Sequence, residues 1–264
     1  MAKPDEIAAG PSTAPARPAL SDAELERRRG RPWTLQIVQA FDIAPHMRRV
    51  QLTADNLADF QPKPGQEIVL QLPQPNGEVA RRHYTIRRFD RATNLIDVDF
   101  VLHGHPTPAV AWALHVRPGE SVDIRGPRGR MSLDPVAAWY LFLGDETAIP
   151  AILSLLEALP SAAKSFAFVE IGREEDRQSV DESKRSQIVF CPRNGAPGPN
   201  DVLFRALAGF SLPDGRGQAF ALGETSNVRA LRHALIERGL DRSQIYSEGY
   251  WRPGRIGGHD HVDE

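Results

Sequence analysis

Four arginines surround one tyrosine and one threonine in the stretch Arg81–Arg88. A guanidinium group binds phosphate oxygens through two parallel hydrogen bonds, because its planar fork matches their geometry. A tyrosine ring offers a flat stacking surface, and a threonine hydroxyl can donate or accept a hydrogen bond. Such a set suits a flat cofactor with a phosphate tail, such as a flavin dinucleotide, and a solvated surface strand is the structural alternative. Its members are Arg82, Tyr84, Thr85 and Arg87.

A second candidate is the stretch Asp99–Gly104, which reads as a strand end and leads into the helix-like segment Pro108–His115. A helix start presents unpaired backbone N–H groups and the positive end of the helix dipole, which suit a pyrophosphate. His103 lies between strand and helix, although a lone histidine near apolar residues is more often structural. The sequence therefore predicts a second phosphate contact at this helix start.

Two later stretches add weaker indications. Gly144–Pro150 connects a strand to a helix, and ligands bind at the carboxyl ends of parallel strands. Its two consecutive acids would repel a phosphate at close range, so its spacing alone says little. Gly249–Arg252 places two aromatic residues side by side. These rings could close over a flat ligand, or they could plug the hydrophobic core.

The first half of the chain must position the arginine stretch on short strands. Alternating or β-branched apolar residues separated by Gly/Pro turns predict a small antiparallel barrel with one helix inside the series. The expected strands are 33–38, 47–52, 68–72, 82–87, 95–102 and 121–124, and the helix is 108–115.

The second half alternates strands and helices, which predicts a doubly wound parallel sheet. The expected strands are 139–143, 165–170, 187–191, 218–223 and 244–252, and the helices are 151–159, 203–208 and 226–238. We therefore divide the chain into four parts: a disordered arm (1–30), a barrel domain (31–134), an α/β domain (135–256) and a flexible tail (257–264).

Composition excludes several classes of function. A net charge of −2 gives no reason to expect nucleic acid or an anionic membrane as partner. No apolar run is long enough to span a membrane, and Met1–Pro18 lacks a signal-peptide core, so we expect a cytoplasmic protein without membrane insertion. Cys191 is the single cysteine, which rules out an internal disulfide and a cysteine-ligated iron–sulfur cluster within one chain. The histidines of the tail lack a framework for a metal site.

Together the four stretches resemble the siderophore-interacting proteins, flavin-dependent ferric-siderophore reductases of the ferredoxin–NADP reductase-like superfamily. The motifs occur in the family's order, as R-x-Y-T-x-R at 82–87, D-F-V-L-H-G at 99–104, G-D-E-T-A-x-P-A at 144–151 and G-Y-W-R at 249–252. The resemblance covers about residues 33–256 and implies an antiparallel β-barrel FAD-binding domain followed by an α/β NAD(P)-binding domain. Thr107 replaces the usual glycine before Pro108, and its hydroxyl can itself donate a hydrogen bond to the cofactor.

The resemblance also implies roles for individual residues. Arg82 would hold the FAD pyrophosphate, Tyr84 would stack on the isoalloxazine ring, and Thr85 would act near the flavin N5 atom. Tyr250 and Trp251 would lie near the flavin face. Further cofactor contacts are implied for Arg87, Asp99, Val101, His103, Gly104, Thr107, Ala109 and Trp112. The nicotinamide nucleotide would meet Gly144, Asp145, Glu146 and Thr147.

The implied reaction transfers hydride from NADH or NADPH to FAD and then single electrons to a chelated Fe(III), releasing Fe(II). Ferric siderophores are bulky and often anionic, so we expect Arg128, Arg130 and Arg252 to form an electropositive mouth. Glu170 at the end of the second strand gives a slight lean toward NADH, because an acid there commonly bonds the ribose diol and disfavours a 2′-phosphate, whereas the nearby Arg173 would have the opposite effect.

Two other functions stay open at the level of sequence. A flavin reductase, or a reductase that feeds an oxygenase, would share the fold and the cofactors. A carrier that binds a ferric siderophore without reducing it would need no flavin at all.

Overall fold

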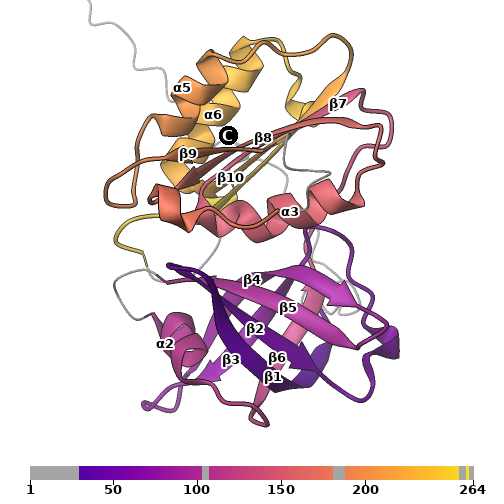
Figure 1. Ribbon diagram of the computed structural model, residues 1–264, viewed down its shortest axis with the longest axis vertical. Helices are drawn as coiled ribbons and strands as arrows, with labels where there is room; N and C mark the ends of the chain where they lie inside the picture. Colours follow the sequence, from indigo (N-terminus) through magenta and orange to yellow (C-terminus); the bar gives the residue numbers. More distant parts are fainter. Residues whose placement is uncertain (1–29, 103–106, 181–187, 256–259, 262–264) are drawn as a thin grey trace, which may run out of the picture.

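The computed structural model describes residues 30–102, 107–180, 188–255 and 260–261. Within them a closed barrel is followed by a six-stranded sheet, and the two units stack along the long axis of the molecule (Figure 1). This confirms the predicted fold class. The expected arm and tail lie almost entirely outside the described residues.

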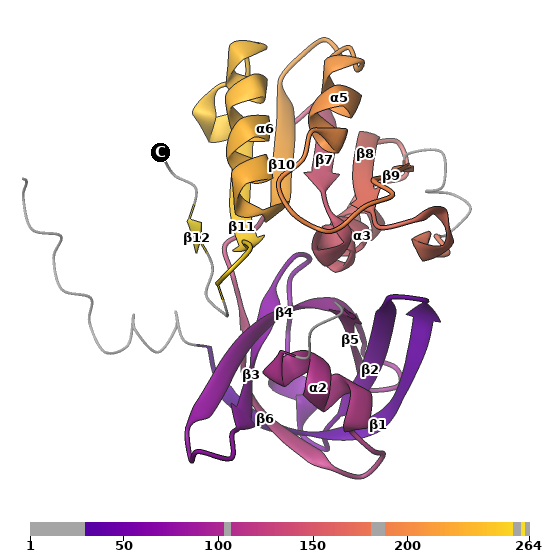
Figure 2. The same ribbon diagram turned by 90° about the vertical axis from the view of Figure 1, so that its left-hand side faces the viewer.

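The barrel consists of six antiparallel strands in the order β1-β2-β5-β4-β3-β6. Alternate side chains along each strand fill its interior, including Leu35, Val50, Ile68 and Phe100. A short helix, α2 (Pro108–His115), packs against strands β2, β3 and β5 (Figure 2). The strands are β1 (Pro32–Ala44), β2 (Met47–Thr53), β3 (Glu67–Pro73), β4 (Val79–Asp90), β5 (Leu95–Val101) and β6 (Ser121–Arg128).

The second unit has the strand order β12-β11-β10-β7-β8-β9, in which β12 is antiparallel to β11 and the other neighbours are parallel. Helix α3 covers the sheet face toward the barrel, and α5 and α6 cover the opposite face (Figure 1). The elements are β7 (Trp139–Gly144), α3 (Ile149–Ala158), β8 (Lys164–Ile171), β9 (Ile188–Pro192), α5 (Val202–Ala208), β10 (Gly217–Glu224), α6 (Thr225–Glu237), β11 (Ile245–Trp251) and β12 (Asp260–His261).

Helix α3 and strand β4 form much of the seam between the two units. The Arg87 guanidinium on β4 donates two hydrogen bonds to the Glu157 carboxylate on α3, at 2.5 and 2.9 Å. The Gly65 N–H donates to the Ser154 hydroxyl of the same helix at 3.0 Å. The expected domain boundary at residues 134–135 falls between β6 and β7 and stays a prediction.

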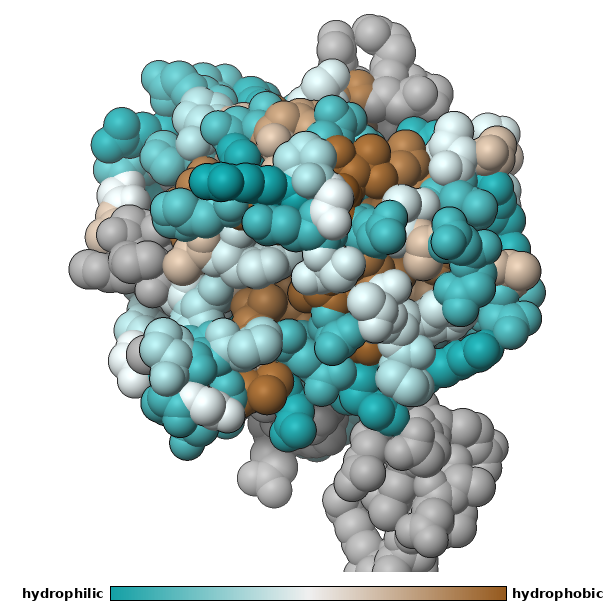
Figure 3. All heavy atoms as spheres, turned by 90° about the horizontal axis from the view of Figure 1, so that it is seen from below, coloured by the Kyte–Doolittle hydropathy of each residue, from teal (hydrophilic) through white to brown (hydrophobic). Residues whose placement is uncertain are grey.

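The surface seen from below is mainly hydrophilic, with apolar side chains in small separate groups (Figure 3). Such scattered apolar residues are ordinary on a surface that faces water. Among the described residues, no helix combines the length and the apolar character that crossing a membrane requires.

One buried ion pair ties β2 to β5. The Asp99 side chain is 0% exposed and accepts two hydrogen bonds from Arg49, at 2.7 and 2.8 Å. Asp99→Ala should lower the free energy of unfolding by about 3 kcal/mol, because it leaves the largely buried Arg49 guanidinium without its main partner. Asp59→Ala removes an exposed pair with Arg31 and should cost about 1 kcal/mol or less. Urea denaturation of both variants measures the difference, and equal losses would contradict this account.

Candidate functional site

Tyr84, which is predicted to stack on the flavin, belongs to an aromatic cluster with Phe100 and Trp112. The Tyr84 ring on β4 packs on Phe100 with ring centroids 4.2 Å apart, and Trp112 of α2 packs on the other side of the cluster, 5.6 Å from Phe100. Burial raises the pKa of Tyr84 above its usual range. The ring therefore stays neutral and packs against the barrel core.

A pocket of about 500 Å³ lies between the β3–β4 turn and the start of α2. Arg82 and Pro108 both line it. The Arg82 guanidinium contacts a backbone carbonyl, that of Arg81, at 2.9 Å. A positive side chain beside a helix start fits a phosphate group, so these residues suit the FAD pyrophosphate.

Thr107, which replaces the usual glycine, is the N-cap of α2. Its side-chain oxygen accepts a long hydrogen bond, 3.4 Å, from the Val110 N–H. Its backbone φ of −71° is ordinary for any residue, so this conformation does not require glycine. Thr107 thus meets a structural need of the helix and remains compatible with a cofactor at the same end.

Thr85 and Tyr250 meet across the seam. A hydrogen bond joins their hydroxyl groups, which connects β4 of the barrel to β11 of the sheet. Burial raises the pKa of Tyr250 well above its usual range, and the Glu248 carboxylate acts in the same direction. The structure therefore brings together two predicted flavin contacts that lie 165 residues apart in the chain (250 minus 85).

Other predicted cofactor contacts have structural partners in the described residues. Arg87 is bound to Glu157, and Asp99 is bound to Arg49. Ala109 and Val101 are buried. His103 and Gly104 lie outside the described residues, so their predicted roles stay predictions.

The acidic loop after β7 turns one carboxylate inward. Asp145 is buried and accepts four hydrogen bonds, from Thr147 N and Oγ1, from the Glu224 N–H and from the Trp251 indole. Burial and, after it, repulsion by the adjacent Glu146 raise the pKa of Asp145 to about 7, against the opposing effect of its hydrogen bonds. Asp145 thus joins the carboxyl ends of β7, β10 and β11 and is directed away from any ligand in the cleft.

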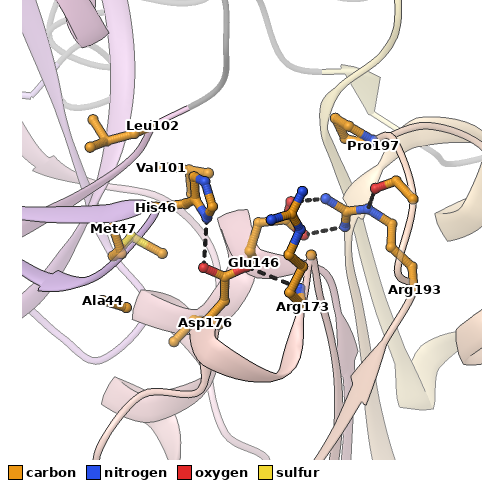
Figure 4. Close-up of a pocket in the computed structure, with 13 residues that line it drawn as sticks. Ala44, His46, Met47, Val101, Leu102, Glu146, Arg173, Asp176, Arg193 and Pro197 are labelled. Atoms are coloured by element: carbon orange, nitrogen blue, oxygen red, sulfur yellow. Dashed lines mark hydrogen bonds and ion pairs between the residues drawn. The ribbon is translucent and has the colours of Figure 1, made fainter.

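A cleft of about 200 Å³ opens beside this loop, outside the carboxyl ends of β7, β8 and β9 (Figure 4). Glu146 lines it and accepts two hydrogen bonds from Arg193, at 2.6 and 2.7 Å. Arg193 also binds Glu170, which is 2% exposed and held by Asn200 as well. Both bonds are to Oε1, whereas Oε2 is buried without a hydrogen-bond partner among the described residues.

His46 and Arg173 lie on the walls of the same cleft (Figure 4). His46 Nδ1 lies 2.7 Å from an Asp176 oxygen, a contact that crosses from the β1–β2 turn to the loop after β8. Neither His46 nor Arg193 belongs to the four sequence motifs, so neither was predicted as a site residue. The position of Arg193 directly after a strand was the one available indication, since carboxyl ends of parallel strands host ligands.

The expected basic mouth contains acids as well. Arg128 Nε lies 3.1 Å from Glu67, without the alignment of a hydrogen bond. Burial, together with the Glu248 and Glu67 carboxylates, raises the pKa of Tyr246 on β11. The exposed Arg130 acts on this pKa in the opposite direction. Arg128 is therefore largely neutralised by Glu67. Arg130 and Arg252 are exposed at their positions.

The comparison with known families decides the identity of the chain. Residues 78–131 match the family model described as the siderophore-interacting FAD-binding domain, and residues 137–254 match that of the siderophore-interacting protein. The chain belongs to the siderophore-interacting protein family. The first match covers Arg82, Tyr84 and Thr85, so the expected FAD cofactor is confirmed for this part of the chain.

Individual relatives and solved structures are consistent with this family assignment. The ferric vibriobactin reductase ViuB of Vibrio cholerae is 32% identical over 249 residues, covering 85% of this chain and 90% of the relative. A siderophore utilization protein from T. fusca has a TM-score of 0.79 and 34% identity, covering 87% of this chain and 96% of that one. Phthalate dioxygenase reductase shares the fold at 18% identity, with a TM-score of 0.67 over 85% of this chain and 70% of that one.

The role of Asp145 can be tested through stability. Asp145→Asn should lower the free energy of unfolding by about 2 kcal/mol, because an amide cannot accept hydrogen bonds from all four donors. The pKa of this carboxyl lies near 7 in the fold against an ordinary 3.8, so the native state binds more protons between these values. The wild type should therefore lose one component of its stability as pH rises from about 4 to 7.

Urea denaturation across this pH range compares wild type with the variant. Asp145→Asn should lack the falling component. An identical pH dependence in both proteins would overturn the assignment. Asp134→Asn, which changes an acid on the connection between β6 and β7, is the control.

Proposed function

We propose that this protein is an FAD-dependent ferric-siderophore reductase. It takes hydride from NAD(P)H and passes electrons singly to chelated Fe(III), which releases Fe(II). The observation that carries the proposal is the hydrogen bond between Tyr250 and Thr85, the residue that follows Tyr84 on β4, in a chain related to a ferric vibriobactin reductase. In this proposal a flat redox cofactor lies at this position between the two units.

The protein residues supply binding and orientation. Arg82 and the start of α2 hold the phosphates of FAD, Tyr84 stacks on its ring, and Thr85 offers a hydroxyl at the seam. Bound FAD would accept two electrons from the donor and release them one at a time. No protein nucleophile is required for this chemistry.

The donor nucleotide fits the cleft beside Glu146, because it lies at the carboxyl ends of parallel strands. Glu170 would favour NADH by bonding a ribose diol, yet the residue is only 2% exposed and its Oε1 atom is held by Arg193 and Asn200. Arg173 lines the cleft and is exposed, so its guanidinium is the group that can meet a 2′-phosphate. NADPH is therefore the better donor in this proposal.

Arg130 and Arg252 attract the anionic chelate, whereas Arg128 is neutralised by Glu67. The double variant Arg130→Ala/Arg252→Ala should raise the apparent KM for a ferric tris-catecholate about tenfold, because two long-range attractive charges are lost. The effect should shrink as salt concentration rises. A KM unchanged from wild type at low salt would contradict this role.

The main experiment begins with a spectrum. The purified protein, supplied with FAD, should be yellow, should be bleached by NADPH faster than by NADH, and should then form Fe(II) from a ferric tris-catecholate in the presence of a colorimetric Fe(II) trap. Faster turnover of free flavin than of ferric chelate would favour a flavin reductase. A protein that takes up no FAD would favour a siderophore carrier.

A further inference from the structure

One face of the β3–β4 ribbon carries a group of titratable residues that the proposed reaction has not used. In the antiparallel register Glu67 lies opposite Thr85, and His83 lies two residues before Thr85 on β4. Successive side chains of a strand alternate in direction, so these three share one face and Arg82 and Tyr84 share the other. His83 therefore lies on the face that meets Tyr250 of the sheet.

His83 and Glu67 form a close pair. The His83 Nδ1 atom lies 2.8 Å from the Glu67 carboxylate, and their side chains are 23% and 15% exposed. The carboxylate partner favours the tautomer with the proton on Nδ1, which places the lone pair of the neutral ring on Nε2. The pair is thus partly shielded from water, and uptake of a second proton by the ring would take place on Nε2.

The proposed reaction leaves a proton that must be removed. Each NAD(P)H delivers one proton and two electrons as hydride, and the two electrons leave singly on two Fe(III) ions. One proton per donor therefore remains in the seam. Histidine is the side chain best suited to exchange a proton near neutral pH.

We propose that His83 is the proton carrier of the site, taking the leftover proton on Nε2 while Glu67 holds the imidazole and balances its positive charge. This inference rests on the proposed function and adds a residue to it. The imidazolium formed shares the Glu67 carboxylate with Arg128, and its proton then passes to water or to the chelate oxygens that reduction frees from iron.

The charged groups around the pair fit this role. From β6, Arg128 lies 3.1 Å from the same Glu67 oxygen and limits how much negative charge the pair holds at rest. From β11, Tyr246 donates to Glu248 at 2.8 Å, and Tyr250 bonds Thr85. Burial raises the pKa of both tyrosines above the usual range, so neither takes the place of histidine near neutral pH.

The test separates the two halves of the reaction by rapid mixing. In His83→Gln the amide keeps a donor for Glu67 but cannot carry a proton, so reduction by NADPH should stay at the wild-type rate. Reoxidation by a ferric tris-catecholate should slow about tenfold or more, which is a modest share of what a positioned acid–base group contributes. Added imidazole should restore the rate. His115→Gln, at the exposed end of α2, is the matched control and should behave as wild type.

A second readout does not depend on turnover. Nitrogen NMR of the flavin-free protein should show His83 with its proton on Nδ1, and Glu67→Gln should reduce the share of that tautomer. Reoxidation of His83→Gln at the wild-type rate from pH 6 to 8, or a tautomer unaffected by Glu67→Gln, overturns the inference. Failure of the wild type to oxidise NADPH or to form Fe(II) would instead overturn the proposed function.

Discussion

The Asp145 carboxylate holds together the edge of the sheet on which the proposed site depends. Its four donors come from the loop after β7, from the junction of β10 with α6, and from the end of β11. Gly223 makes this possible, because it adopts a φ of +123° and a Cβ there would lie 2.4 Å from the carboxylate. Without this tie the end of β11, which carries Tyr250 and Trp251, would keep its pairing with β10 but lose its side-chain bond to the loop after β7.

This anchoring gives the acidic loop a physical meaning. In many nucleotide-binding folds the loop after the first strand of the sheet is rich in glycine and binds phosphate directly. Here Asp145 turns inward, and Glu146 is neutralised by Arg193. The loop can therefore stand beside a phosphorylated nucleotide without strong repulsion, even though its two acids suggest the opposite.

The chemistry of the molecule is concentrated where its two units touch. Arg87–Glu157 and His46–Asp176 cross the seam as ion pairs or hydrogen bonds, and Thr85–Tyr250 crosses it as a hydroxyl pair. Each unit contributes half of every contact. Because hydride entry and electron exit both take place between the units in the proposed reaction, the contacts that hold the seam also set the positions of the reacting groups.

The sequence by itself determined the order of strands and helices, the fold class, and the family, because alternation, apolar runs and short motifs are local properties of the chain. It also identified Arg82, Tyr84, Thr85 and Tyr250 as a group. Only the tertiary structure decided what the charged residues bind. The partners of Arg87, Trp251 and Arg193 lie 70, 106 and 23 residues away, in Glu157, Asp145 and Glu170. Spacing along the chain holds no information about such pairings, since they are created when the strands and helices pack.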